Sequence, residues 1–273
     1  MNRIDALFQR LRQDGRRALM PFVTAGDPDL ETTAALIPEL VARGAHMVEV
    51  GIPYSDPIAD GPVIAASYSR ALRRGIKLGQ ILEMVRDLRT GPTGGSLAAT
   101  PLVFMVSYAI VHRHGADRFL REASRAGVDG LIVPDLPVEE SPGLGRLATA
   151  FDLRLIQLVT PTTPRDRAVQ IACSTTGFLY YVSVAGITGE RTSLPPELAE
   201  NVAWLRTQTE LPVCIGFGIS AADHIRALAP VADGLIVGSA LVRRLAAAQE
   251  TPRAEVVREI GQFIGSLAEA LEA

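Results

Sequence analysis

Short apolar runs alternate with longer amphipathic segments about eight times along the 273 residues of the chain. The short runs are nearly continuous in Val, Ile, Leu and other apolar residues, which is typical of strands buried on both faces. Strands that alternate with helices run parallel and are joined by right-handed crossovers, so the pattern predicts an α/β fold. The predicted strands are 19–24, 47–51, 102–106, 130–133, 155–159, 178–182, 213–217 and 234–237.

Helical periodicity fills the intervals between these runs and continues after the last of them. It predicts helices at 30–43, 78–89, 117–126, 165–172, 196–208, 221–229 and about 252–272. Eight strand–helix units close into a (β/α)8 TIM barrel, whose usual length of about 250 residues is close to that of this chain. We therefore predict a single parallel eight-stranded barrel domain over residues 1–273, with an extra N-terminal helix. A doubly wound open sheet is the alternative.

Charge and hydropathy disfavour several kinds of partner and location. A net charge of −3 and a pI near 5.9 argue against nucleic-acid binding, which needs a strongly basic face. No apolar run approaches the roughly 18 residues that span a bilayer. Residues 1–11 carry charges every few positions, unlike a signal peptide. We therefore expect a cytoplasmic protein that binds neither nucleic acid nor membrane, with Cys173 and Cys214 as buried thiols.

The strongest functional signal follows the second predicted strand. Glu49 lies within the apolar run 47–51, and alternation places its neighbours Val48 and Val50 on the opposite face. If the valines pack against the helices, Glu49 points into the mouth of the barrel, where burial raises its pKa. Asp60 follows on a proline-rich loop, either as a second catalytic carboxylate or as a helix cap. Two carboxylates in different environments suit general acid–base chemistry.

Glycine-rich turns after the last two predicted strands indicate a phosphate site. Residues 216–220 (GFGIS) and 237–240 (VGSA) each lead into a predicted helix. Glycines allow close approach to an anion, and a helix N-terminus offers free N–H groups. In TIM barrels this is the usual place for phosphate. The long segment 184–196 (VAGITGERTSLPP) has two glycines and is predicted to be an active-site lid.

These motifs resemble the tryptophan synthase α subunit family over nearly the whole chain. The most specific segment is 49–62 (EVGIPYSDPIADGP), supported by 21–28 (PFVTAGDP), 134–140 (PDLPVEE) and the two glycine turns. The resemblance implies retro-aldol cleavage of indole-3-glycerol phosphate to indole and glyceraldehyde 3-phosphate. Once its C3 is protonated, the indole ring is itself the electron sink for this cleavage. No lysine, metal or cofactor is then needed, and Lys77 is the only lysine of the chain.

The resemblance also implies a role for each site residue. Glu49 is expected to protonate C3 and to take the proton of the side-chain hydroxyl, while Asp60 accepts a hydrogen bond from the indole N–H. Thr188 is expected to fasten the closed lid against Asp60. The expected indole-binding residues are Phe22, Met105, Ile132 and Val159, with Tyr180 beside Glu49 or the glycerol moiety. The expected phosphate-binding residues are Gly189, Gly218, Gly238 and Ser239.

A β subunit is the partner that the resemblance implies, in an α2β2 complex, with pyridoxal phosphate only in that β subunit. Two residues depart from the family pattern, which commonly has glutamine at Ala65 and asparagine at Ala109. A free-standing lyase that supplies indole to a specialised pathway therefore stays open, as does a non-catalytic activator of the β subunit. Sugar-phosphate isomerases would share the glycine turns. Many of them use metal-binding histidines, whereas His112 and His114 are expected on a surface loop without further ligands.

Overall fold

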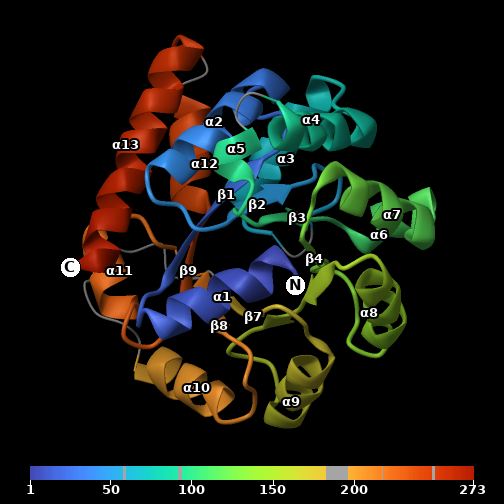
Figure 1. Cartoon of the computed structure of the whole chain (residues 1–273), viewed down its shortest axis with the longest axis vertical. Coiled ribbons are helices and arrows are strands. Elements are labelled where there is room, and N and C mark those ends of the chain that lie inside the picture. Colours follow the sequence, from blue (N-terminus) through green and yellow to red (C-terminus); the bar gives the residue numbers. More distant parts are fainter. Residues whose placement is uncertain (58–59, 92–93, 183–195, 217, 248–249) are drawn as a thin grey trace.

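Nine parallel strands form a single sheet at the centre of the molecule, and helices surround it (Figure 1). The coordinates, a computed structural model, describe residues 1–57, 60–91, 94–182, 196–216, 218–247 and 250–273. The strands are β1 (Ala18–Thr24), β2 (Val48–Gly51), β3 (Leu102–Met105), β4 (Gly130–Ile132), β5 (Arg154–Ile156), β6 (Leu158–Val159), β7 (Leu179–Val182), β8 (Val213–Gly216) and β9 (Gly234–Val237).

The barrel closes through the fifth predicted strand. The strand order is β5-β4-β3-β2-β1-β9-β8-β7-β6, so β5 and β6 are the two ends of the sheet. Only Gln157 separates them in the chain. The run predicted at 155–159 is therefore one strand that pairs with β4 through its first half and with β7 through its second half. This confirms the predicted parallel barrel, in which the interruption at Gln157 makes nine strands out of eight.

The helices of the described residues are α1 (Arg3–Gln13), α2 (Leu30–Ala42), α3 (Pro62–Arg73), α4 (Leu78–Thr90), α5 (Gly94–Leu97), α6 (Tyr108–His114), α7 (Ala116–Ala126), α8 (Ser141–Ala150), α9 (Arg165–Ser174), α10 (Pro196–Arg206), α11 (Ala222–Leu228), α12 (Ser239–Ala247) and α13 (Arg253–Glu272). The seven predicted ranges agree to within two residues at each end with α2, α4, α7, α9, α10, α11 and α13. No bounds were predicted for the other helices. No helix in the described ranges is both long enough and apolar enough to cross a lipid bilayer.

Alternating side chains divide the core into two layers. Residues such as Val48 and Val50 pack between the strands and the surrounding helices. Residues of the opposite face fill the barrel, and helix α1 covers that interior at its amino-terminal end with apolar side chains. The ring of Phe8 on α1 lies 5.7 Å from that of Phe178, centroid to centroid. The extra N-terminal helix is therefore confirmed, and Figure 1 shows it crossing the middle of the barrel.

The two cysteines differ in exposure. Cys214 is buried inside the barrel, whereas Cys173 on α9 is exposed, so the prediction of two buried thiols is wrong for Cys173. The reason is helical geometry. Ile171 and Ala172 are buried on the inner face of α9, and the next position along the helix turns toward solvent.

Candidate active site

A cavity of about 160 Å³ lies at the carboxyl ends of the strands, where TIM barrels carry their active sites. Two carboxylates share it with a largely apolar wall and with the glycine turns after β8 and β9. The lining residues are Phe22, Glu49, Asp60, Gly61, Ile64, Met105, Pro134, Leu158, Tyr180, Val182, Gly216, Gly218, Ile236, Gly238 and Ser239.

Strand β2 aims Glu49 into this cavity. Its neighbours Val48 and Val50 belong to the outer layer, so the alternation of the strand turns Glu49 inward, beside Phe22 of β1 in the sheet register. The Glu49 side chain is buried, with 1% of its surface exposed. Within the part of the chain that the structure describes, neither of its carboxyl oxygens has a hydrogen-bond partner. A buried group without partners is costly, and a ligand in the cavity would supply them.

Burial sets the protonation state of Glu49. Loss of water around the carboxyl, with the nearby negative charge of Asp60 as a second cause, raises its pKa to about 8. Glu49 is therefore mostly protonated at neutral pH. A carboxylic acid in this state delivers a proton into the cavity and can take one back as the conjugate base.

Asp60 stands at the cavity with a partner of its own. The Tyr54 hydroxyl donates a hydrogen bond to Asp60 Oδ2 at 3.1 Å, and the Tyr54 ring packs 5.4 Å from that of Tyr68. Burial and the charge of Asp135 raise the pKa of Asp60, while the bond from Tyr54 lowers it, and the pKa is raised on balance. The two cavity carboxyls thus have different surroundings, since within the described ranges Asp60 has a hydrogen-bond partner and Glu49 has none.

Glycines at two strand ends make room for the aromatic wall. A Cβ atom at Gly51 would lie 2.5 Å from Cζ of Phe22, and one at Gly216 would lie 2.7 Å from Cε2 of Tyr180. Both distances are far below van der Waals contact, so any side chain there would displace the ring. The glycines of β2 and β8 therefore fix where Phe22 and Tyr180 stand beside Glu49.

The glycine turns form the opposite rim of the cavity. Gly218, Gly238 and Ser239 all line it, and helix α12 begins at Ser239. The first N–H groups of a helix have no partner within the helix and carry a partial positive charge. Gly218 has a φ of +42°, a conformation that glycine adopts easily. This rim has the geometry of an anion site.

Most of the residues that were predicted to line the pocket do so, but two of them do not. Phe22, Met105 and Tyr180 are in the wall. Ile132 faces the same interior but lies deeper, since Pro134, two residues nearer the mouth, lines the cavity instead. Val159 needs correction, because its side chain packs in the outer layer. Thr188 and Gly189 lie outside the described residues.

Sequence reasoning missed several wall residues, among them Leu158 and Ile64, and the partner of Asp60. Strict alternation from the inward Ile156 indicates Leu158, not Val159, and Leu158 is the residue that lines the cavity. Ile64, within the first turn of α3, could have been found from its spacing to Asp60. Nothing in the sequence pattern pairs Tyr54 with Asp60, because that contact depends on the path of the loop.

The structure also bears on metal and Schiff-base chemistry. Among the residues with described positions, no group of three or more His, Cys, Asp or Glu side chains is placed to hold a metal ion. His112 and His114 lie on helix α6, so their assignment to a loop is wrong, and His114 Nε2 lies 2.7 Å from Glu122. Lys77 is exposed at the start of α4, away from the cavity lining.

Comparison with known families decides what kind of barrel this is. The family model described as "Tryptophan synthase alpha chain" matches residues 8–272. The chain belongs to the tryptophan synthase alpha chain family. The alpha chain of Rhodopirellula baltica is 51% identical over 280 residues, and the alignment covers 100% of both chains. That of Prochlorococcus marinus is 48% identical, covering 98% of this chain and 94% of its own.

Solved structures of the family have the same fold. The alpha subunit of tryptophan synthase from Legionella pneumophila superposes with a TM-score of 0.89 at 37% identity, covering 100% of this chain and 99% of its own. A chain of tryptophan synthase from Mycobacterium tuberculosis gives 0.87 at 32% identity, with coverage of 100% and 99%. A chain of the tryptophan synthase complex from Pyrococcus furiosus gives 0.81 at 34% identity, with coverage of 92% and 98%.

Proposed function

We propose that this chain is the α subunit of a tryptophan synthase and cleaves indole-3-glycerol phosphate into indole and glyceraldehyde 3-phosphate. The observation that carries the proposal is the buried Glu49, whose carboxyl has no hydrogen-bond partner among the described residues, in a cavity that also holds Asp60 and an anion rim. Burial raises the pKa of this carboxyl to about 8, which suits it to donate a proton. Family membership supports this reaction over the sugar-phosphate isomerases and over a non-catalytic activator.

In the proposed reaction, Glu49 moves a single proton within the substrate. The protonated carboxyl donates to C3 of the indole ring, which leaves positive charge on the ring nitrogen. The bond between C3 and the side-chain carbon then breaks, and its electron pair returns to the ring. The hydroxyl on that carbon becomes the aldehyde, and its proton goes to the Glu49 carboxylate. The acid is thereby restored, with no net gain or loss of protons.

Asp60 has the complementary role in this proposal. As a carboxylate it accepts a hydrogen bond from the indole N–H and stabilises the positive charge that develops on the ring nitrogen. The hydroxyl of Tyr54, 3.1 Å from Oδ2, supports this role in two ways. It favours the ionised form of Asp60, and it occupies one oxygen so that the carboxylate is held in place.

The rest of the cavity positions the two ends of the substrate. Phe22, Met105 and Leu158 form an apolar wall suited to the indole ring. Gly218, Gly238 and Ser239 are proposed to bind the phosphate through backbone N–H groups at the start of α12. The roles of Thr188 and Gly189 as lid and phosphate residues stay predictions.

The proposed partner is a β subunit that consumes indole. Family membership supports an α subunit over a free-standing lyase, although Ala65 and Ala109 depart from the residues that the family commonly has at these positions. This chain then needs no cofactor for its own step, and pyridoxal phosphate is expected only in the β subunit. A cytoplasmic location stays a prediction.

Indole release from indole-3-glycerol phosphate tests the proposal. The purified chain should release indole, and adding a tryptophan synthase β subunit should increase the rate. The Glu49→Gln variant is the matched control, because it keeps the shape of the side chain and loses the acid. An absence of indole above background from the chain, alone and with the β subunit, would reject the function.

A further inference from the structure

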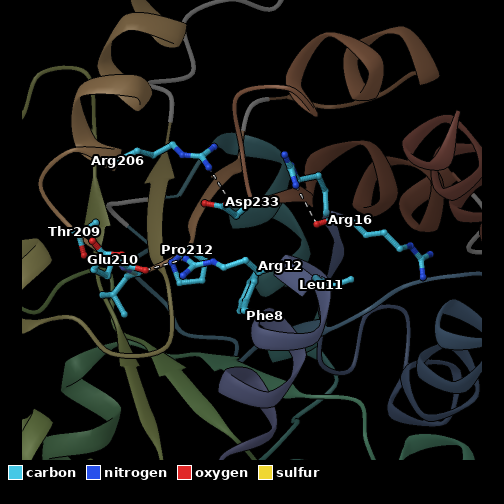
Figure 2. A pocket seen from close by; sticks show the side chains of 11 residues that line it. Phe8, Leu11, Arg12, Arg16, Arg206, Thr209, Glu210, Pro212 and Asp233 are labelled. Carbon is cyan, nitrogen blue, oxygen red and sulfur yellow. Dashed lines mark hydrogen bonds and ion pairs between the residues drawn. The ribbon is translucent and has the colours of Figure 1, made fainter. Parts of the chain in front are cut away.

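A second cavity, of about 430 Å³, lies at the opposite end of the barrel from the candidate active site. Three residues that line it come directly before strands, namely Arg17 before β1, Pro212 before β8 and Asp233 before β9. Since the strands are parallel, residues that precede them gather at the amino-terminal end. Helix α1 and the loop after it form another wall of this cavity (Figure 2).

The lining of this cavity is positively charged. Four arginines and two carboxylates contribute to it, which gives a net charge of +2. Both carboxylate oxygens of Asp233 already have partners. Oδ1 lies 3.2 Å from Arg206 Nη2, and Oδ2 accepts a hydrogen bond from the amide of Val213. Arg16 pairs with Glu272 on α13. Figure 2 shows Arg206 directed at Asp233 and Arg16 extending away from the other labelled side chains.

With these two pairs set aside, Arg12, Arg17 and the carboxylate of Glu210 leave a net charge of +1 at the cavity. Arg12 Nη2 donates to the backbone oxygen of Glu210 at 3.0 Å, and Arg17 Nε donates to that of Ala229 at 3.2 Å. Arg17 also donates to two carbonyls of its own loop. Counting only residues with described positions, neither guanidinium forms an ion pair. Each guanidinium has five N–H donors, so both keep donors free for an added acceptor.

A small apolar surface adjoins these arginines. It comes mainly from Leu211 and Pro212, which are half-buried in the loop before β8, because Phe8 and Leu11 of α1 are only 6% and 2% exposed. A cavity with an apolar wall and a few convergent polar groups is the usual form of a small-molecule site. Guanidinium groups match the planar, two-oxygen geometry of carboxylate and phosphate. A bare inorganic ion would leave this apolar surface without a partner.

We propose that this cavity is a binding site for a small organic anion, one that carries a carboxylate or phosphate on an apolar body. Arg12 and Arg17 hold the oxyanion, and Leu211 and Pro212 contact the apolar part. The site is separate from the proposed lyase cavity, which lies at the carboxyl ends of the strands. The proposed anion site therefore does not depend on the proposed lyase function.

Amide chemical shifts of the full chain test this proposal, with phenyl phosphate as the probe. Saturable shifts are expected at residues 8–17 and at Leu211 and Val213, whereas amides of Gly238 and Ser239 report separately on the candidate active site. Inorganic phosphate lacks the ring and benzyl alcohol lacks the charge. Both should bind at residues 8–17 at least about tenfold more weakly than phenyl phosphate, since each loses one of the two contributions to binding.

Variants on the same helix locate the charge that binds. Arg12→Gln should raise the dissociation constant at residues 8–17 about tenfold, through loss of a charge-assisted hydrogen bond. Arg10→Gln removes the same charge from α1 outside the cavity lining and should change it by less than about twofold, because screening weakens distant charges. Absence of saturable shifts, equal binding of benzyl alcohol, or equal effects of the two variants would each overturn the proposal.

Discussion

The hydroxyl of Tyr54 donates a hydrogen bond to Oδ2 of Asp60 at 3.1 Å, within the loop that follows β2. This bond opposes the burial and the charge of Asp135 that raise the pKa of Asp60. In the proposed reaction Asp60 must be a carboxylate, because only then does it stabilise positive charge on the indole ring. Tyr54 therefore helps to keep Asp60 in its active form.

Replacing Tyr54 by phenylalanine should weaken catalysis at low pH more than at high pH. The variant loses the bond that lowers the pKa of Asp60, so a larger fraction of Asp60 is protonated at any acidic pH. We expect kcat/KM to fall about 10–150-fold, in line with loss of one hydrogen bond to a charged group. The acid limb of the profile of kcat/KM against pH should shift to higher pH. An unchanged acid limb would show that Tyr54 does not act on Asp60.

Glu49 should make the folded chain less stable as pH rises. Its pKa is about 8 in the folded chain, against an ordinary value of 4.5 for glutamate, so between these values the folded state binds more protons than the unfolded state. The contribution of Glu49 to the free energy of unfolding is therefore complete below about pH 4.5, and it is lost as the pH rises toward 8. Since one pKa unit corresponds to about 1.4 kcal/mol, Glu49→Gln should gain about 2–4 kcal/mol relative to the wild type between pH 5 and 8.5.

Urea unfolding of the wild type and of Glu49→Gln at several pH values measures this difference. The comparison between the two chains cancels the other titrating groups. A difference in the free energy of unfolding that stays constant from pH 5 to about 8.5 would contradict the raised pKa.

Alanine at Gly216 should disturb Tyr180. Its Cβ would lie 2.7 Å from both Cε2 and the hydroxyl oxygen of Tyr180, so the ring must move within a packed core. We expect a loss of about 1–3 kcal/mol in stability and a fall in kcat/KM. Gly143→Ala is the control, because a Cβ on that exposed residue of α8 meets nothing within 4 Å. If Gly216→Ala matched this control in thermal unfolding and activity, Tyr180 would not depend on Gly216.

A negative charge at Ser239 should weaken binding of the phosphate end. In Ser239→Asp the carboxylate stands at the start of α12, where the substrate phosphate is proposed to bind, and the like charges repel. KM for indole-3-glycerol phosphate should rise at least about tenfold. Ser239→Ala keeps the backbone N–H groups and should change KM much less. Equal KM values for the wild type and Ser239→Asp would reject the phosphate assignment.

The fold could be predicted because strand and helix periods differ so clearly in this chain. The inward turn of Glu49 also followed from its position between Val48 and Val50. The break at Gln157 could not be predicted, since 155–159 forms one apolar run in which only the pairing partners change. Val159 was misplaced because the family resemblance was followed where alternation pointed to Leu158.

Other features depend on contacts between distant parts of the chain. The pair of Tyr54 and Asp60 arises from the path of a loop, and periodicity carries no information about it. The depth of Ile132 depends on how far β4 extends toward the mouth of the barrel. The arginine-lined cavity joins α1 to the loop before β8, about 200 positions away in the chain. No local motif marks such a site.

Single-turnover cleavage of indole-3-glycerol phosphate by Glu49→Gln shows whether Glu49 moves the proton in this reaction. The glutamine keeps the size of the side chain and the ability to form hydrogen bonds, but it cannot transfer the proton. We predict near-normal substrate binding with a rate of indole formation lowered by about 10²–10⁴-fold, the usual contribution of a general acid–base group. A variant that cleaves the substrate at the wild-type rate would contradict the assignment of Glu49 as the acid and base of this site.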